Sequence, residues 1–106
     1  MDTACRATGL RYVRGRRVGV CWATDAELQD RLGPPDYERQ IDDNVTRIWY
    51  FDTPRGAVEL QKYWCDTDGQ HSIDAADWRG GLHVARLLRH MGLKAYHRSP
   101  GALNVN

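Results

Sequence analysis

The chain has 106 residues, a formal net charge of +1 and a hydrophobic fraction of 42%, which suits one small folded domain with a modest core. No apolar run approaches the roughly 20 residues that a membrane-spanning helix needs, and no charged segment leading into an apolar run opens the chain, so neither a membrane protein nor a secretory signal is expected. The three cysteines lack close spacing, which argues against a disulfide framework and favours a reducing compartment, so the expected location is the cytoplasm.

The first element expected is a β-hairpin over residues 10–22, because apolar side chains alternate there on both sides of an Arg-Gly-Arg turn. Its second strand carries Val18, Val20 and Trp22 at a period of two. That period predicts that these three side chains share one face of a sheet.

A short helix is expected next, over residues 25–32. Thr24 and Glu27 have the spacing of a capping box, and Gly33 is positioned to end the helix. Residues 36–44 are polar and are expected to form a loop or one helical turn.

The centre of the chain predicts three strands. Residues 45–51 hold β-branched and aromatic side chains, and residues 57–65 form the returning strand after a Pro- and Gly-containing turn. A third strand is expected at residues 71–73.

The last large element is expected to be a helix over residues 75–91, capped by Asp74 or Ser72, with an apolar arc wide enough to cover a sheet. A short strand over residues 93–98 follows. The resulting order, ββαβββαβ, predicts an α+β fold in which an antiparallel meander packs the long C-terminal helix on one face.

The domain organisation expected is a single α+β domain over residues 1–98. Residues 99–106 are expected to form a flexible tail.

Aromatic side chains occur on both faces of the two central strands, although only one face can belong to the core if helices form a single layer. Tyr50 and Tyr63 are therefore expected to be exposed and to offer a protein-binding surface. The alternative is that the amino-terminal hairpin or a dimer partner covers this second face.

Charge is strongly segregated along the chain. Residues 1–24 contain five Arg against one Asp, residues 25–77 carry a net charge of −8, and residues 78–106 contain five bases and no acid. These blocks either pair with one another across the fold or leave faces of opposite sign.

Two basic features could contact the phosphates of a nucleic acid. One is the hairpin turn next to Tyr12, and the other is a stripe on the final helix that also holds His83 and His90. The candidate residues are Arg14, Arg16, Arg17, Arg79 and Arg86.

The acidic middle offers the opposite possibility, since a row of carboxylates can imitate a row of phosphates. The alternative is an ordinary solvated loop. With the two exposed tyrosines, the candidate residues for binding a protein partner are Asp36, Glu38, Asp42 and Asp43.

Residues 66–77 resemble the twelve-residue calcium loop of EF-hands and, more closely, of dockerin modules. The candidate oxygen ligands are Asp66, Asp68, Asp74 and Asp77. Gln70 and His71 depart from the pattern, because the loop favours a stronger oxygen donor and then a glycine at these positions. A turn followed by an Asp-capped helix explains the same residues.

No nucleophile elbow, zinc spacing or glycine-rich phosphate loop occurs in the sequence. An enzyme would require His71 or His97 to lie near a carboxylate or a thiol in a cleft. We therefore expect a binding protein without catalysis and without a cofactor.

The general layout resembles that of small accessory proteins of phages and mobile elements, a group that includes anti-CRISPR proteins. The resemblance is carried by the stretches TDAEL (24–28), LGP (32–34), WYFDTPRG (49–56) and HSI (71–73). It implies a stoichiometric inhibitor that blocks a bacterial defence or nucleic-acid-processing complex by mimicking nucleic acid or by wedging between subunits. The expected partner is therefore a protein complex of a bacterial host, and the expected state is a monomer or homodimer away from membranes.

Overall fold

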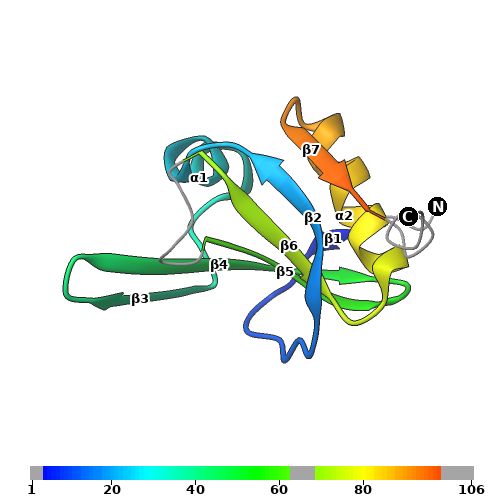
Figure 1. Ribbon diagram of the computed structural model, residues 1–106, viewed down its shortest axis with the longest axis horizontal. Helices are drawn as coiled ribbons and strands as arrows, with labels where there is room; N and C mark the ends of the chain where they lie inside the picture. The colour runs from blue at the N-terminus through cyan, green and yellow to red at the C-terminus, as the bar shows by residue number, and fades with distance from the viewer. Residues whose placement is uncertain (1–3, 63–68, 99–106) are drawn as a thin grey trace, which may run out of the picture.

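A computed structural model describes residues 4–62 and 69–98, in which seven antiparallel strands form one sheet accompanied by two helices (Figure 1). The elements are β1 (Cys5–Arg6), β2 (Arg16–Trp22), α1 (Asp25–Leu32), β3 (Tyr37–Ile41), β4 (Asn44–Thr53), β5 (Gly56–Lys62), β6 (His71–Ala75), α2 (Trp78–His90) and β7 (Lys94–His97). The α+β class and the antiparallel sheet are confirmed.

The strand order is β1-β4-β5-β6-β2-β7, with β3 also paired to β4. Strands β4 to β6 form the meander expected from the three central strands, but β2 lies between β6 and β7 rather than beside a strand from residues 10–13. The predicted topology is wrong at this point. Pairing on both sides of β2 satisfies its backbone groups along two edges, which a hairpin with residues 10–13 would not achieve.

The loop or helical turn expected over residues 36–44 is instead β3 and its turn into β4. Its polar sequence does not indicate a strand. This two-stranded ribbon extends beyond the rest of the sheet (Figure 1), so its side chains need not be apolar. Asp42 occupies the turn with a φ of 56°, a conformation that Asp tolerates better than most residues.

The main core lies on one face of the sheet, called here the helix face, where both helices contribute buried side chains. Alternation along β5 and β6 brings Leu60 and Ile73 directly opposite each other on this face. Their buried neighbours include Leu28 of α1, with Val84 and Leu88 of α2. Burial of this apolar surface is the main force that holds the helices on the sheet.

Helix α2 is shorter than predicted and starts at Trp78, with Asp77 rather than Asp74 or Ser72 as its N-cap. Residues 71–75 pair with both β2 and β5, and a strand hydrogen-bonded on two sides prevails over the helical pattern. Gly81 lets the helix approach the sheet closely, because a Cβ there would overlap Val18.

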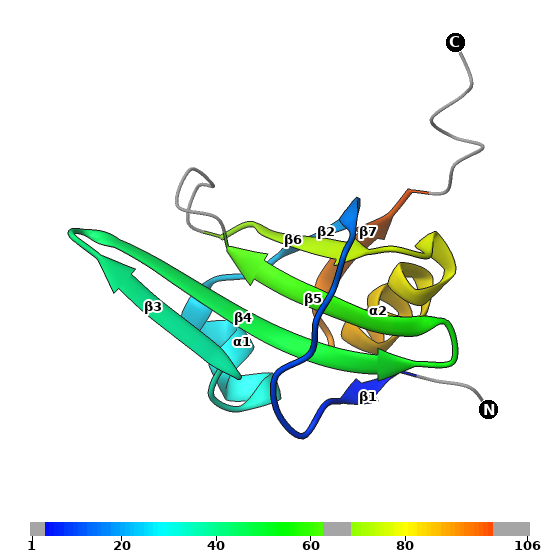
Figure 2. The same ribbon diagram turned by 90° about the horizontal axis from the view of Figure 1, so that it is seen from below.

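The opposite face of the sheet, called here the open face, carries a second small cluster formed by Ala7, Ile48 and Tyr50 with Val13 and Tyr37 packed against it. The segment that joins β1 to β2 crosses β4 and β5 on this face, away from the helices (Figure 2). Tyr50 is therefore only 7% exposed, and its predicted exposure is wrong. The alternative, cover by the amino-terminal segment, holds at Tyr50, whereas Tyr63 lies outside the described residues.

Neither helix found in residues 4–62 and 69–98 has the length and apolar character needed to cross a bilayer. The predicted tail, residues 99–106, lies outside the described residues.

Candidate functional site

A β-bulge in β2 decides which side chains reach the open face. Arg17 pairs with Asp74 and Gly19 with the next residue, Ile73, so Val18 is an extra residue in β2. Val18 is buried in the main core, whereas Val20 is only partly buried. Beyond the bulge, alternation therefore directs Val20 to the open face, and Trp22 with it.

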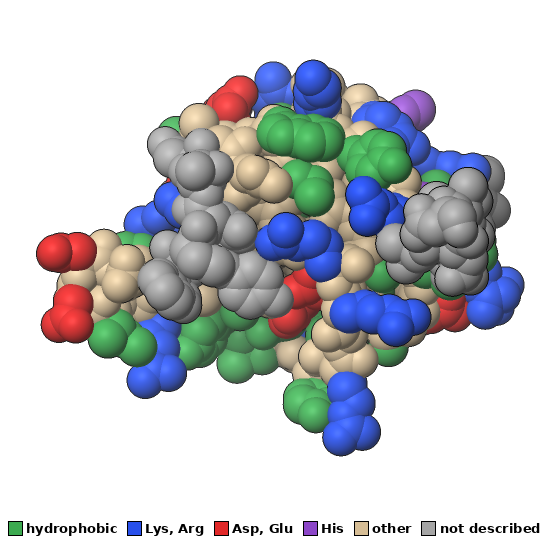
Figure 3. Space-filling view, viewed as in Figure 1, with side chains coloured by type: hydrophobic (Ala, Val, Ile, Leu, Met, Phe, Trp, Pro, Cys, Tyr) green, Lys and Arg blue, Asp and Glu red, His purple; other side chains and the backbone are tan. Residues whose placement is uncertain are grey.

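The open face of β2 and β7 carries aromatic and cationic side chains in close alternation, and we call it the basic–aromatic surface. Trp22 and Tyr96 are 43% and 47% exposed, although both are large and apolar. The ammonium of Lys94 lies 5.6 Å from the Trp22 ring centroid, within cation–π range. Figure 3 shows hydrophobic side chains over β2 and β7 with Lys and Arg around them. The surface consists of Arg17, Val20, Trp22, Lys94, Tyr96 and Arg98.

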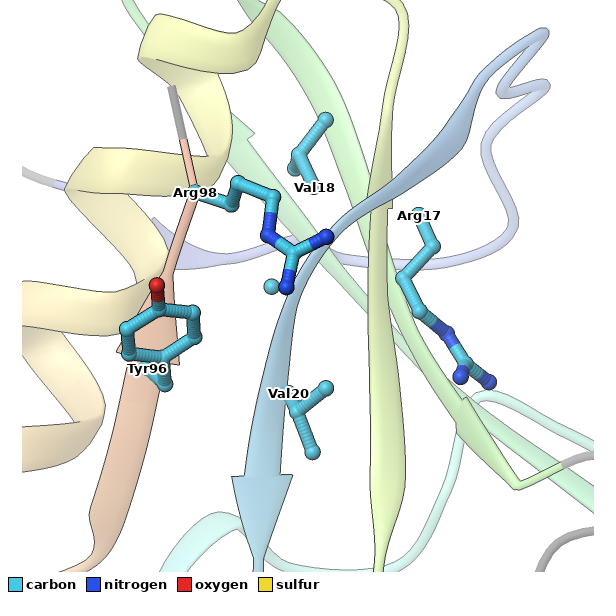
Figure 4. Close-up of a pocket in the computed structure, with 6 residues that line it drawn as sticks. Arg17, Val18, Val20, Tyr96 and Arg98 are labelled. Carbon is cyan, nitrogen blue, oxygen red and sulfur yellow. The ribbon is translucent and has the colours of Figure 1, made fainter. Parts of the chain in front are cut away.

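A pocket of about 350 Å³ opens within this surface, between β2 and β7 (Figure 4). Tyr96 and Arg98 line it from β7 and the residues after it, and Arg17 lies on the other side of β2. The backbone N–H of Arg98 donates to the carbonyl oxygen of Val18 at 2.8 Å, which extends the pairing of the two segments by one residue. The guanidinium of Arg98 therefore lies at a concave, largely apolar site, whereas that of Arg17 points away from Tyr96 and Arg98 (Figure 4).

A buried polar band separates the basic–aromatic surface from the Tyr50 cluster. The Nε of Arg17 donates to Ser72 at 2.8 Å, and Ser72 in turn donates to Asp74. The amide of Gln61 donates to Glu59 at 2.7 Å and to Asp74 at 3.0 Å. Arg17 is thus held at the border between this acidic band and the surface.

Glu59 has an unusual ionisation because it is partly buried and also lies directly opposite Asp74 on the neighbouring strand. Burial, and then the charge of Asp74, raise the pKa of Glu59 from 4.5 to about 7. The folded state therefore binds a proton that the unfolded state releases between these two values, so this group lowers stability as pH rises from 4.5 to 7.

Glu59→Gln is expected to be more stable than the wild type by roughly 1–2 kcal/mol near pH 8, with the difference vanishing near pH 4. The measurement is urea unfolding at several pH values. The matched control is Glu38→Gln, because Glu38 is exposed on β3. A gain in stability that does not change with pH would show that Glu59 is ionised normally in the folded state.

The basic residues singled out from the sequence do not form one site. Arg17 belongs to the basic–aromatic surface, Arg14 is exposed in the segment before β2, and Arg16 is exposed at the first position of β2. Arg79 pairs with Asp77 at 3.1 Å, and Arg86 is exposed on α2, which covers the other face of the sheet. The stripe on α2 is therefore separate from Arg17.

Part of the segregated charge pairs within the fold. Arg6 contacts Asp36 at 2.6 Å, and Arg11 contacts Asp52 at 2.9 Å. These two contacts join the basic amino-terminal block to the acidic middle block, as one of the two sequence-based alternatives anticipated.

The acidic candidates are also divided. The side chain of Asp36 is 12% exposed and accepts hydrogen bonds from Arg6 and from the backbone N–H of Tyr50. It therefore fixes the amino-terminal segment to β4 instead of facing solvent, and its predicted place in an open acidic row is wrong. Glu38, Asp42 and Asp43 remain exposed on the hairpin of β3 and β4.

The two described members of the predicted calcium set have other partners. Asp74 accepts from Ser72 and Gln61 on the open face, and Asp77 accepts from the backbone and guanidinium of Arg79 at the start of α2. Asp66 and Asp68 lie outside the described residues. Within residues 4–62 and 69–98, no three His, Cys, Asp or Glu side chains are grouped as metal ligands would be.

His71, one of the two histidines considered for catalysis, contacts a carboxylate that no sequence pattern indicated, that of Asp25. His71 lies on β6 with no exposed surface, and its ring nitrogens contact the Ala23 carbonyl at 3.0 Å and Asp25 at 2.7 Å. Asp25 also pairs with Arg47. Burial lowers the pKa of His71, and the hydrogen bond to Asp25 opposes that shift. Both ring nitrogens are engaged within the protein, so neither is available to a substrate.

Cys21 lies directly opposite His71 on β2 and is completely buried. Burial raises the pKa of its thiol to about 12, which keeps the sulfur protonated and weakly nucleophilic near neutral pH. His97, the other histidine considered for catalysis, is half-buried, and its Nε2 lies 3.2 Å from the Trp78 carbonyl oxygen.

Comparisons with protein-family models, with curated proteins and with solved structures find no match to this chain. The resemblance to phage accessory proteins therefore stays a prediction.

Proposed function

We propose that the protein binds nucleic acid through the basic–aromatic surface. The observation that carries this proposal is the joint exposure of two aromatic rings and several cationic side chains on the same face of two adjacent strands. Phosphates bind Arg and Lys through charge and hydrogen bonds, and this contribution supplies most of the affinity in non-specific complexes.

The charges of Lys94 and Arg98 are available for such contacts. Among the described residues, no carboxylate forms an ion pair with Lys94 or Arg98, and the same holds for Arg14 and Arg16 nearby. By contrast, Arg6 and Arg11 are already paired inside the fold. The net charge of the chain is small, but the electric field at the basic–aromatic surface is positive. This local field is the one that acts on a bound polyanion.

The test is a binding titration with a fluorescein-labelled oligonucleotide at several salt concentrations. Arg98→Gln and Lys94→Gln are each expected to weaken binding and to reduce the slope of log K against log salt by about one. The matched control is Arg86→Gln, which removes an exposed Arg from α2 on the other face of the sheet and is expected to leave both quantities unchanged.

Two results would contradict the proposal. Loss of affinity in Arg86→Gln alone would move the interface to α2. An absence of binding even at low salt would remove nucleic acid as the ligand.

A second candidate is binding of a protein partner, such as a bacterial complex that the chain inhibits. The hairpin of β3 and β4 supports it, because this hairpin projects from the sheet and exposes Glu38, Asp42 and Asp43 around the apolar Ile41 (Figure 1). The titration separates the two candidates, since a protein that works only through the hairpin would bind neither single-stranded nor double-stranded nucleic acid. Its partner would then be sought in nuclease-treated bacterial lysate, with Asp42→Asn/Asp43→Asn as the negative control.

A further inference from the structure

We infer that the ligand of the basic–aromatic surface is a single-stranded nucleic acid whose bases stack on Trp22 and Tyr96. This inference rests on the proposed function and specifies the form of nucleic acid. Phosphate contacts alone would suit single and double strands equally. The two aromatic rings discriminate between these forms, because only an unpaired strand offers base faces for stacking.

The register of the two strands fixes the relation between the rings. Val20 lies opposite Tyr96, and Trp22 lies opposite Lys94. Trp22 and Tyr96 are therefore diagonal neighbours on one face, a relation that places side chains roughly 7–8 Å apart in antiparallel sheets. Bases stacked on each other along a duplex strand repeat about every 3.4 Å, so this spacing suits two bases that have left their stack.

The cations are placed to hold the backbone between such bases. Along β7 and the residue after it, Lys94, Tyr96 and Arg98 alternate on the open face as cation, aromatic ring and cation. Arg98 also borders the pocket next to Tyr96 (Figure 4). A strand with one base on Trp22 and the next on Tyr96 therefore has Lys94 close to the phosphate that links them, and Arg98 next to the phosphate that follows.

Exposing the Trp22 and Tyr96 rings to water costs free energy, and a ligand that covers them would remove this cost. Large apolar side chains exposed side by side, rather than singly, are characteristic of binding surfaces in small proteins. Tyr12 and Leu10 are also exposed, but they lie in the segment before β2, away from β7. At β2 and β7, two exposed rings, cationic side chains and a pocket occur together on one face.

The experiment compares a labelled oligothymidine of about ten nucleotides with a labelled duplex of equal length, a range that covers single-strand sites of one small domain. Wild-type protein is expected to prefer the single strand. Trp22→Ala and Tyr96→Ala are each expected to weaken single-strand binding about tenfold and to affect duplex binding much less. Trp22→Phe keeps a stacking ring and is expected to restore most of the affinity.

The matched control is Tyr12→Ala, because Tyr12 is 83% exposed but lies outside the surface. Thermal unfolding of each variant verifies that the fold is intact. If both forms bind equally and the two alanine variants match the wild type, the stacking inference is wrong while the proposed function survives. If neither form binds, the proposed function itself fails.

Discussion

Replacing Asp25 with alanine is expected to destabilise the fold by about 3 kcal/mol, one of the two largest effects expected in this protein. The carboxylate of Asp25 contacts His71 at 2.7 Å through one oxygen and Arg47 through the other. His71 has no exposed surface, and the Asp25 side chain is only 16% exposed. Removing the carboxylate leaves one ring nitrogen of His71 unpaired and takes the closest acid away from Arg47 in a poorly solvated place. Breaking a buried pair in this way typically costs 3–5 kcal/mol.

The measurement is urea unfolding followed by circular dichroism. Asp30→Ala is the matched control, because Asp30 lies on the same helix with an 81% exposed side chain and a loose 3.6 Å contact to Arg31. It is expected to change stability by less than about 0.5 kcal/mol. Equal stabilities for the two variants would show that the Asp25 network contributes nothing to folding.

The pH dependence gives a second check on this network. Burial lowers the pKa of His71, and Asp25 acts in the opposite direction. Because the pKa of His71 in the folded state is below its ordinary value of 6.5, the folded state loses stability as the pH falls below 6.5. The unfolded chain binds the proton first. Without Asp25 the folded pKa falls further, so Asp25→Ala is expected to lose more stability than the wild type between pH 7 and about pH 5.

The interior elements were predictable because their signals are local. The capping box at Thr24 and Glu27 is formed as expected, with the Glu27 backbone N–H donating to the Thr24 hydroxyl at 3.1 Å. The strand expected at residues 45–51 lies within β4. A cap or a β-branched run is specified by residues near one another in sequence, so reading the chain recovers it.

The basic–aromatic surface was not predictable, because the bulge at Val18 interrupts the regular alternation of side chains along β2. The spacing of Val18, Val20 and Trp22 predicts that all three side chains share one face of a sheet. The bulge at Val18 separates it from the other two residues, sending Val18 into the core and Trp22 to the open face. The bulge depends on the pairing of β2 with β6, some fifty residues away in sequence, and no pattern among the neighbouring residues predicts it.

Lys94, Tyr96 and Arg98 were missed for a related reason. Their alternation at the end of the chain is visible in the sequence, but only the placement of β7 beside β2 joins it to Trp22. The His71–Asp25 contact likewise joins residues 46 positions apart. Contacts over such separations depend on the sheet topology, and the predicted topology is wrong at β2.

Gly19→Ala tests whether this geometry, and not composition alone, makes the binding surface. A Cβ at Gly19 would overlap the carbonyl oxygen of Tyr96 and lie 3.4 Å from the Cα of His97. Both atoms belong to the backbone of β7, so no side-chain rotation relieves the overlap. Strand β7 has to move away from β2, and a cost of about 2 kcal/mol is expected.

The variant removes no charge and no aromatic ring, yet it displaces the strand that carries Lys94 and Tyr96. We therefore expect weaker oligonucleotide binding and faster hydrogen exchange at the Arg98 amide, which donates to Val18 in the native pairing. Val20→Ala is the control for the exchange measurement alone, since Val20 lies on the same strand but belongs to the basic–aromatic surface. Its exchange at the Arg98 amide is expected to match the wild type. If Gly19→Ala binds and exchanges like the wild type, the close contact of β2 with β7 is dispensable. The side chains alone would then suffice for binding, and the surface would not depend on the bulge.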